Sequence, residues 1–265
     1  MMTPDTDIEK TVLCATDGPI ATITLNRPAK LNAIDPTMLM QLDAIAADLE
    51  RAHDVRVVLL TGAGERAFCV GADIGAWSAL APLEMWRHWI RDGHRVFGRV
   101  ARLPQPVIAV LGGHAFGGGL ELALAADLRL AAEGAELAFQ EVKLATVPGW
   151  GGTQRLPALI GASRAKRMIF TGGRIDAATA ERWGLVDLVA PRQDLMDRAR
   201  ALAGEIAANA PVSVRIAKQL IDSAGGTATG EILEALAGAL AATTSDAREG
   251  ATAFRERRPP QFKGD

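Results

Sequence analysis

Two glutamates on glycine-rich segments are the side chains of this sequence best suited to chemistry. Glu121 ends the run Gly112-Gly-His-Ala-Phe-Gly-Gly-Gly-Leu-Glu121, and Glu141 precedes the run Val147-Pro-Gly-Trp-Gly-Gly-Thr-Gln-Arg-Leu156. Glycines let a backbone approach a ligand closely, and a carboxylate beside such a backbone can accept or deliver protons. Each glutamate alone is more typical of an ordinary helix start or a solvated loop. Together, beside exposed amides, they favour proton chemistry on a carbonyl compound.

Three consecutive glycines, residues 117–119, stand ahead of a predicted helix. The first amides of a helix are unpaired and carry the positive end of its dipole, so they can hold a phosphate or a developing oxyanion. A tight packing turn is an equally good interpretation of the glycines alone. A phosphate-binding loop is excluded, because Gly118 and Gly119 stand where Lys and Ser/Thr are required. A dinucleotide-binding loop at residues 62–67 is rejected because residues 68–71 do not continue as a helix.

Composition narrows the class of protein. The 265 residues include 49% hydrophobic and 23% charged side chains, as in an ordinary globular protein. A net charge of −2 gives no electrostatic reason to expect nucleic acid or a membrane surface as a partner. Cys14 and Cys69 are too few for a disulfide framework, and no metal-ligand spacing is present in the sequence. The acidic N-terminus does not resemble a signal peptide, so we expect a cytoplasmic location.

Strand and helix patterns alternate up to about residue 205 and are helical from there to the C-terminus. This divides the chain into an α/β core, residues 1–205, and a C-terminal helical region, residues 206–265. The strands are predicted over 12–16, 20–25, 55–60, 107–111 and 128–131. The helices are predicted to begin at Asp35 and to span 83–102, 118–126, 163–170, 177–183, 194–208, 212–223, 231–241 and 246–257.

Several motifs in order resemble the crotonase (enoyl-CoA hydratase/isomerase) superfamily, nearly from end to end. They are Leu25-Asn-Arg-Pro-Ala-Lys-Leu-Asn-Ala33, Ala67-Phe-Cys-Val-Gly-Ala-Asp-Ile74, Ala115-Phe-Gly-Gly-Gly-Leu-Glu-Leu-Ala123 and Val147-Pro-Gly-Trp-Gly-Gly-Thr-Gln-Arg-Leu156. The resemblance implies a spiral of strand–strand–helix turns followed by a helical trimerisation region. It also implies an acyl-CoA substrate and a homotrimer or a dimer of trimers.

The same resemblance implies roles for individual residues. The amides of Ala72 and Gly118 would bind the thioester oxygen. Glu121 would orient and deprotonate a water molecule that attacks the β-carbon, and Glu141 would deliver a proton to the α-carbon. No metal or redox cofactor is implied, since coenzyme A is part of the substrate. Contacts with the acyl-CoA are implied for Lys30, Ala33, Val70, Asp73 and Ile74, and for Phe254 and Arg257, often from a neighbouring subunit.

The sequence departs from the family pattern near the acids. Gln140 stands where Pro is common, Gly112 where Asn is common, and Trp150 where a small residue is usual. Trp77, Trp86 and Trp89 form either an apolar core stripe, which is favoured, or the wall of a substrate pocket. We hypothesise that this tryptophan region and Trp150 adapt an acyl pocket to a branched or cyclic chain.

Four functions are compatible with these residues. Hydration of a 2-enoyl-CoA is favoured because both glutamates are present. An enoyl-CoA isomerase or another acyl-CoA lyase would use mainly Glu141. A catalytically idle homologue would bind acyl-CoA or protein without turnover, and a nucleotide-dependent oxidoreductase would rest only on the weak motif at residues 62–67.

Overall fold

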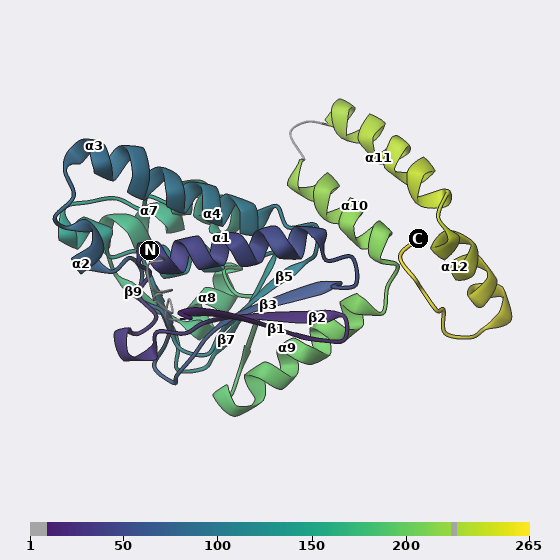
Figure 1. Cartoon of the computed structure of the whole chain (residues 1–265), viewed down its shortest axis with the longest axis horizontal. Coiled ribbons are helices and arrows are strands. Elements are labelled where there is room, and N and C mark those ends of the chain that lie inside the picture. Colours follow the sequence, from purple (N-terminus) through teal and green to yellow (C-terminus); the bar gives the residue numbers. More distant parts are fainter. Residues whose placement is uncertain (1–9, 224–226) are drawn as a thin grey trace, which may run out of the picture.

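The larger of two β-sheets forms the centre of the molecule, which the computed structural model describes over residues 10–223 and 227–265 (Figure 1). Side by side, its strands are β1 (Val12–Asp17), β2 (Ile20–Leu25), β3 (Val57–Gly62), β5 (Val107–Leu111), β7 (Leu128–Ala132) and β10 (Leu188–Ala190). The sheet is parallel except for the hairpin of β1 and β2. Gly18 turns this hairpin at a φ of 53°, which glycine adopts without steric cost.

A second, smaller sheet was not predicted from the sequence. Its strands are β4 (Ala67–Cys69), β6 (His114–Phe116), β8 (Glu136–Ala138) and β9 (Arg174–Asp176). After β3, β5 and β7 the chain passes to β4, β6 and β8, respectively, before it returns to the larger sheet. This alternation gives the strand–strand repetition that the resemblance implied, and it places the loops after the small strands on one side of the molecule.

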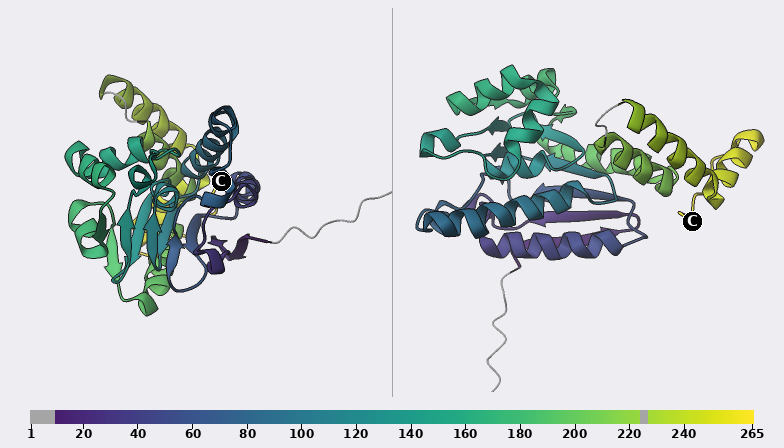
Figure 2. Two further views of the ribbon diagram at one scale, coloured as in Figure 1. Left: turned by 90° about the vertical axis from the view of Figure 1, so that its left-hand side faces the viewer. Right: turned by 90° about the horizontal axis from the view of Figure 1, so that it is seen from above.

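Helices cover both faces of the larger sheet (Figures 1 and 2). α1 (Pro36–Arg51) and α4 (Arg91–Ala101) share one core cluster with Val58 and Leu60 of β3. α9 (Arg192–Ala207) shares the other with Val57 and Leu59 of the same strand. Successive side chains of a strand point to opposite faces, so a strand covered on both sides is a continuous apolar run. This explains why β3 was predicted correctly.

Other helices were predicted with differences. The helix expected over 83–102 is built from α3 (Pro82–Glu84), a π-helical stretch η2 (Met85–Ile90) and α4. α6 (Gly152–Ile160) was not predicted, because its sequence starts with glycines and contains Pro157. The remaining helices are the 3-10 turns η1 (Pro28–Lys30) and η3 (Glu141–Leu144), with α2 (Ile74–Trp77), α5 (Gly118–Ala123), α7 (Ala162–Thr171), α8 (Ala177–Trp183), α10 (Pro211–Asp222), α11 (Thr227–Ala242) and α12 (Ser245–Glu256).

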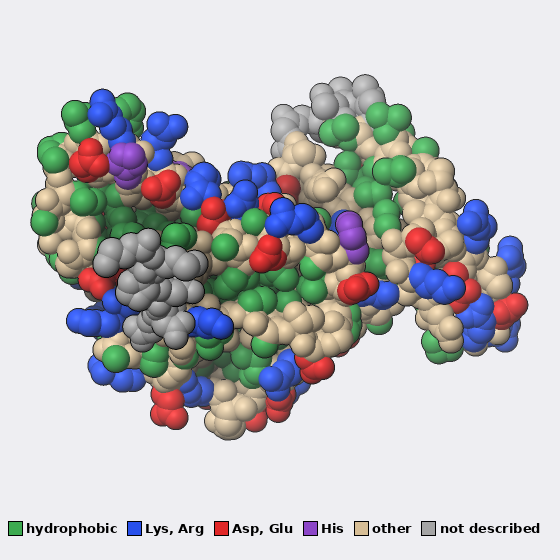
Figure 3. Space-filling view, in the orientation of Figure 1, with side chains coloured by type: hydrophobic (Ala, Val, Ile, Leu, Met, Phe, Trp, Pro, Cys, Tyr) green, Lys and Arg blue, Asp and Glu red, His purple; other side chains and the backbone are tan. Residues whose placement is uncertain are grey.

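The last three helices extend from the sheets as an arm (Figure 1). α10 is fixed to the core by Lys218, whose Nζ donates to Asp127 Oδ2 at 2.8 Å and to the Gln105 carbonyl at 3.1 Å. α11 and α12 lie beyond it, and apolar side chains gather over α10 and α11 in the space-filling view (Figure 3). None of the described helices is both long and apolar enough to cross a membrane.

Candidate active site

A cavity of about 360 Å³ lies where the loops after the small strands meet α5 and the π-helical stretch. Both glutamates singled out in the sequence line it, as do Ala72 and Gly118. Among the described residues, no group of His, Cys, Asp and Glu side chains could hold a metal ion. The other lining residues are mostly apolar and include Val70, Ile74, Trp77, Met85, Trp89, Ile90, Phe116, Leu144, Val147 and Trp150.

Glu121 is buried in the first turn of α5, with 2% of its surface exposed. Its Oε1 accepts hydrogen bonds from the amides of Trp150 at 2.7 Å and Gly152 at 2.8 Å. Burial raises the pKa of Glu121 above its ordinary value, and the bonds from Gly152 and Trp150 oppose the rise. The unpredicted start of α6 therefore orients this carboxyl group and helps it to carry a negative charge.

Glu141 opens η3 on the opposite glycine-rich segment. Burial, and to a smaller extent the charge of Glu121, raise its pKa from 4.5 to about 7, against the effect of a backbone hydrogen bond. Its Oε2 is buried without a hydrogen-bond partner in the described structure. A buried, unpaired carboxyl oxygen facing a cavity is suited to exchange a proton with a bound ligand.

Gly117 allows Glu141 to approach the start of α5. Its φ is 49°, and a Cβ atom there would lie 3.0 Å from Glu141 Oε1. A side chain would therefore be strained and would also push the carboxyl group away. Gly117 is therefore needed for the close approach of the Glu141 carboxyl group, and not only for a tight packing turn.

The amide of Ala72 is directed by an isolated bridge to Ile34. Ile34 N donates to the Gly71 carbonyl, and Asp73 N donates to the Ile34 carbonyl, each at 2.8 Å. In such a parallel bridge the middle residue turns its own N–H and C=O the other way. Ala72 lines the cavity, and its N–H points away from Ile34.

Gly118 supplies a second amide beside the first. It is the first residue of α5, where an N–H has no acceptor within the helix. A Cβ atom on Gly118 would lie 3.5 Å from Ala72 N and 2.7 Å from Trp150 Cζ3. These distances place the two amides close together on the cavity wall. Two convergent N–H groups of this kind can stabilise an oxyanion.

Trp150 closes the inner end of the cavity. It is 2% exposed, its ring lies 5.1 Å from those of Trp89 and Phe97, and its Nε1 donates to the Trp89 carbonyl at 3.2 Å. Any side chain on Gly93 would overlap this indole, with a Cβ atom 2.0 Å from Nε1. Trp150 thus contributes in two ways: its amide donates to Glu121, and its ring packs against Trp89 and Phe97 in the cavity wall. The role of the amide was missed in the sequence, which carries no signal for it.

The other predicted tryptophans divide between two environments. Trp77 and Trp89 line the cavity, so both belong to its wall. Trp89 is also packed in the main core, as the favoured interpretation expected. Trp86 is 59% exposed and belongs to neither. The three do not form one stripe because Trp77 ends α2, whereas Trp86 and Trp89 belong to the separate π-helical stretch.

The residues expected to contact acyl-CoA are only partly gathered here. Val70 and Ile74 line the cavity. The carboxylate of Asp73 instead pairs with Arg27 and caps α2, and Ala33 is buried, with its carbonyl bound to Arg27. Lys30 is exposed at the end of η1. Phe254 and Arg257 lie at α12, at the opposite end of the molecule from α2 and α3 (Figures 1 and 2).

Comparisons with known proteins identify the family to which the chain belongs. The family model described as Enoyl-CoA hydratase/isomerase matches residues 15–265. The short-chain-enoyl-CoA hydratase of Clostridium acetobutylicum is 39% identical over 93% of this chain and 95% of its own. The (E)-benzylidenesuccinyl-CoA hydratase of Thauera aromatica is 40% identical over 92% of this chain and 96% of its own.

The crystal structure of an enoyl-CoA hydratase from Bacillus anthracis superposes with a TM-score of 0.93 at 41% identity, covering 96% of this chain and all of that one. The two sheets and the C-terminal helices therefore form the crotonase fold. With a family match over nearly the whole length and relatives of this identity, the chain belongs to the enoyl-CoA hydratase/isomerase (crotonase) family.

Proposed function

We propose that the protein is an enoyl-CoA hydratase, which adds water reversibly across the 2,3 double bond of an enoyl-CoA thioester to give a 3-hydroxyacyl-CoA. The observation that carries the proposal is the meeting of Glu121, Glu141 and the amides of Ala72 and Gly118 on one cavity. An isomerase needs one proton-transferring group, whereas hydration uses a group for the water and a group for the α-carbon.

The chemistry follows from the different surroundings of the two acids. The amide bonds to Glu121 favour its carboxylate, which takes a proton from the attacking water as the oxygen bonds to the β-carbon. The double-bond electrons move onto the thioester oxygen, held by the amides of Ala72 and Gly118. Glu141, with a pKa near 7, then gives its proton to the α-carbon. In the reverse direction the two groups exchange these roles.

The names of the relatives support the reaction more than the substrate. One relative is named for short-chain enoyl-CoA and another for (E)-benzylidenesuccinyl-CoA, so similar chains hydrate different acyl groups. Trp77, Trp89 and Trp150 wall the cavity, and we propose that they select a branched or cyclic acyl chain. Equal kcat/KM values for crotonyl-CoA and for a phenyl-substituted enoyl-CoA would contradict this selectivity.

We also propose that acyl-CoA is bound between copies of the chain. Lys30, Ala33, Val70, Asp73 and Ile74 would contact it within one subunit. Phe254 and Arg257 would reach it from a neighbouring subunit of a trimer or a dimer of trimers. The 86% exposure of Phe254, far from the cavity of its own chain, supports this arrangement.

The test is product analysis with matched variants. Glu121→Gln and Glu141→Gln should each lower hydration of crotonyl-CoA by about 10²–10⁴-fold, the usual loss on removal of a general acid or base, while butyryl-CoA still binds. Glu133→Gln, on an exposed turn, is the control and should keep full activity.

Two other outcomes would redirect the assignment. Conversion of a 3-enoyl-CoA to the 2-enoyl isomer by Glu121→Gln at the wild-type rate, with no hydration by the wild-type protein, would identify an isomerase. Binding of butyryl-CoA without turnover of either substrate would identify an idle homologue.

A further inference from the structure

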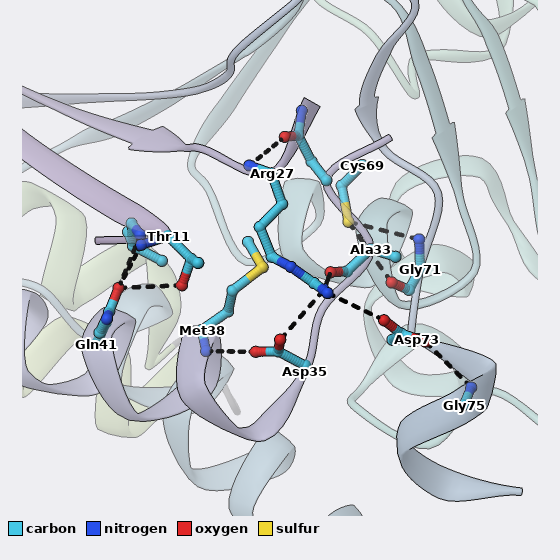
Figure 4. A network of polar contacts seen from close by, with 12 residues as sticks. Thr11, Arg27, Ala33, Asp35, Met38, Gln41, Cys69, Gly71, Asp73 and Gly75 are labelled. Carbon is cyan, nitrogen blue, oxygen red and sulfur yellow. Dashed lines mark hydrogen bonds and ion pairs between the residues drawn. The ribbon is translucent and has the colours of Figure 1, made fainter. Parts of the chain in front are cut away.

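Arg27 lies at the centre of a polar network beside the cavity (Figure 4). Its Nη1 donates to the Ala33 carbonyl at 2.5 Å and lies 3.3 Å from Asp35 Oδ2, and its Nη2 lies 3.2 Å from Asp73 Oδ2. The side chain is 18% exposed, so these contacts are well shielded from solvent. One guanidinium group thus joins two loops that are far apart in the sequence.

Both carboxylates in this network also cap helices. Asp35 Oδ1 accepts from Met38 N at 2.8 Å at the start of α1, and Asp73 Oδ1 accepts from Gly75 N at 3.1 Å at the start of α2. The negative charges of the Asp35 and Asp73 carboxylates would repel each other, but the planar guanidinium group of Arg27 binds both at once. The network therefore fixes the beginnings of both helices relative to each other.

The backbone between these caps carries the Ala72 amide. Ile34 bridges to Ala72, and Ile34 is flanked by two residues that Arg27 binds, Ala33 and Asp35. Asp73, on the other side of the bridge, is held by Arg27 as well. The peptide that presents the Ala72 N–H therefore has Arg27 contacts on both of its sides.

Arg27 itself is held by a buried anchor. Its amide donates to Asn32 Oδ1 at 2.9 Å, and Asn32 is fully buried. Asn32 Nδ2 in turn donates to the carbonyls of Ala63 and Phe68, at 2.9 and 3.1 Å. This chain of contacts runs from β4 and the loop after β3 through Asn32 and Arg27 to the Ala72 peptide.

We propose that Arg27 is a positioning residue that fixes the direction of the Ala72 amide for binding of the thioester oxygen as it gains negative charge. The inference rests on the proposed function. Such donors act only when they are held at hydrogen-bond distance from where the charged oxygen will form, so a freed loop loses this advantage. The ground-state carbonyl carries less charge and depends less on that direction.

The experiment compares a charged and an uncharged ligand. Acetoacetyl-CoA, a β-ketothioester, can form an enolate whose near-ultraviolet absorbance reports the charged oxygen, whereas butyryl-CoA is a saturated thioester. For Arg27→Gln we expect enolate affinity and kcat to fall about tenfold or more, below the ~10²–10³-fold loss of a whole donor, with KM and butyryl-CoA affinity within about threefold of wild type. Arg27→Lys, which keeps the charge without the planar guanidinium group, should restore only part of the loss.

Gln41→Ala is the control for loss of a tertiary contact. Gln41 Oε1 accepts from the amides of Thr11 and Val12 at 2.9 and 2.8 Å, so it holds the start of β1 against α1 (Figure 4). This variant should lower the melting temperature but should not change the affinity for the enolate relative to that for butyryl-CoA. Equal losses for enolate and butyryl-CoA in Arg27→Gln, or an unchanged kcat, would overturn the role of Arg27. If the wild-type protein binds butyryl-CoA but stabilises no enolate, the proposed function fails instead.

Discussion

Glu121 is buried and Glu141 is half-buried, and the oxygen atoms of their carboxyl groups have different partners. Glu121 Oε1 accepts two amide hydrogen bonds, whereas Glu141 Oε2 accepts none in the described structure. Hydrogen bonds to a carboxylate favour its charged form, so Glu121 has the better partners for a negative charge. In the proposed hydration this difference makes Glu121 the base and Glu141 the acid, and the reaction should depend on pH near neutrality.

Hydration should therefore fall as pH rises through about 7. Above that pH Glu141 loses the proton that the α-carbon must receive. The net reaction takes up no proton, so its equilibrium constant is independent of pH and kcat/KM for dehydration should fall in parallel. The measurement is kcat/KM in both directions between about pH 5 and pH 9. Profiles that do not fall above pH 7 would contradict the assigned role, and Glu141→Gln should abolish this decline.

α5 is the element on which the site depends, and its packing is unusually close. A Cβ atom on Gly119 would lie 2.2 Å from the Cys69 carbonyl, so α5 rests directly on the backbone of β4. The contact brings the Gly118 amide to the strand that leads into Ala72. In the run of three glycines, one admits Glu141, one supplies an amide and one allows this contact.

Gly119→Ala should consequently move α5 away from β4. We expect the free energy of unfolding to fall by about 1–3 kcal/mol, as for other overpacked positions, and hydration to fall because the two amides separate. Gly134→Ala is the matched control, since nothing lies within 4 Å of a Cβ atom there. Chemical denaturation and crotonyl-CoA turnover measure both effects. Wild-type turnover in Gly119→Ala would show that the amides tolerate the displacement.

The elements that the sequence predicted are those with enough residues for a pattern. β3 and β5 are continuous apolar runs, and α1 has a cap at Asp35 followed by proline. The strands of the small sheet have only three residues each, too few for any period to appear. α6 was missed because glycine and Pro157 usually end helices.

The candidate site was predicted in its residues but not in its geometry. Spacing could not bring Glu121 and Glu141 together, because the small sheet that juxtaposes their segments is invisible in the sequence. The resemblance to a family supplied that relation. Arg27 had no individual role in the prediction, since its partners Asp35 and Asp73 are adjacent to it only in the folded chain.

At the scale of the whole molecule, the arm of α10 to α12 exposes more apolar surface than a lone chain requires. Leu236 and Leu240 of α11 are 64% and 57% exposed, and four residues apart they lie on one helix face. Phe254 of α12 is exposed to a greater extent. Contiguous exposed apolar residues mark association surfaces. We propose that this face mediates assembly of the trimer.

Placing aspartate at both Leu236 and Leu240 should dissociate the assembly, because charges would be buried without partners. Light scattering after size-exclusion chromatography should change from a trimer or hexamer to a monomer, and KM for crotonyl-CoA should rise as Phe254 and Arg257 are withdrawn from neighbouring cavities. Met40→Asp, at an exposed position of α1, should leave the mass unchanged. A wild-type monomer with full activity would refute the proposed assembly.

The π-helical stretch η2 affects how the acyl-facing wall of the cavity in this protein could change. Met85, Trp89 and Ile90 of this stretch form part of the cavity wall, while the acids come from α5 and η3. A π-helix holds its extra residue with i→i+5 bonds, so deleting one residue would convert η2 to an α-helix and rotate new side chains inward. Natural variation or laboratory evolution could thus exchange the acyl-facing surface by changes in chain length alone, with the proton-transferring groups kept in place.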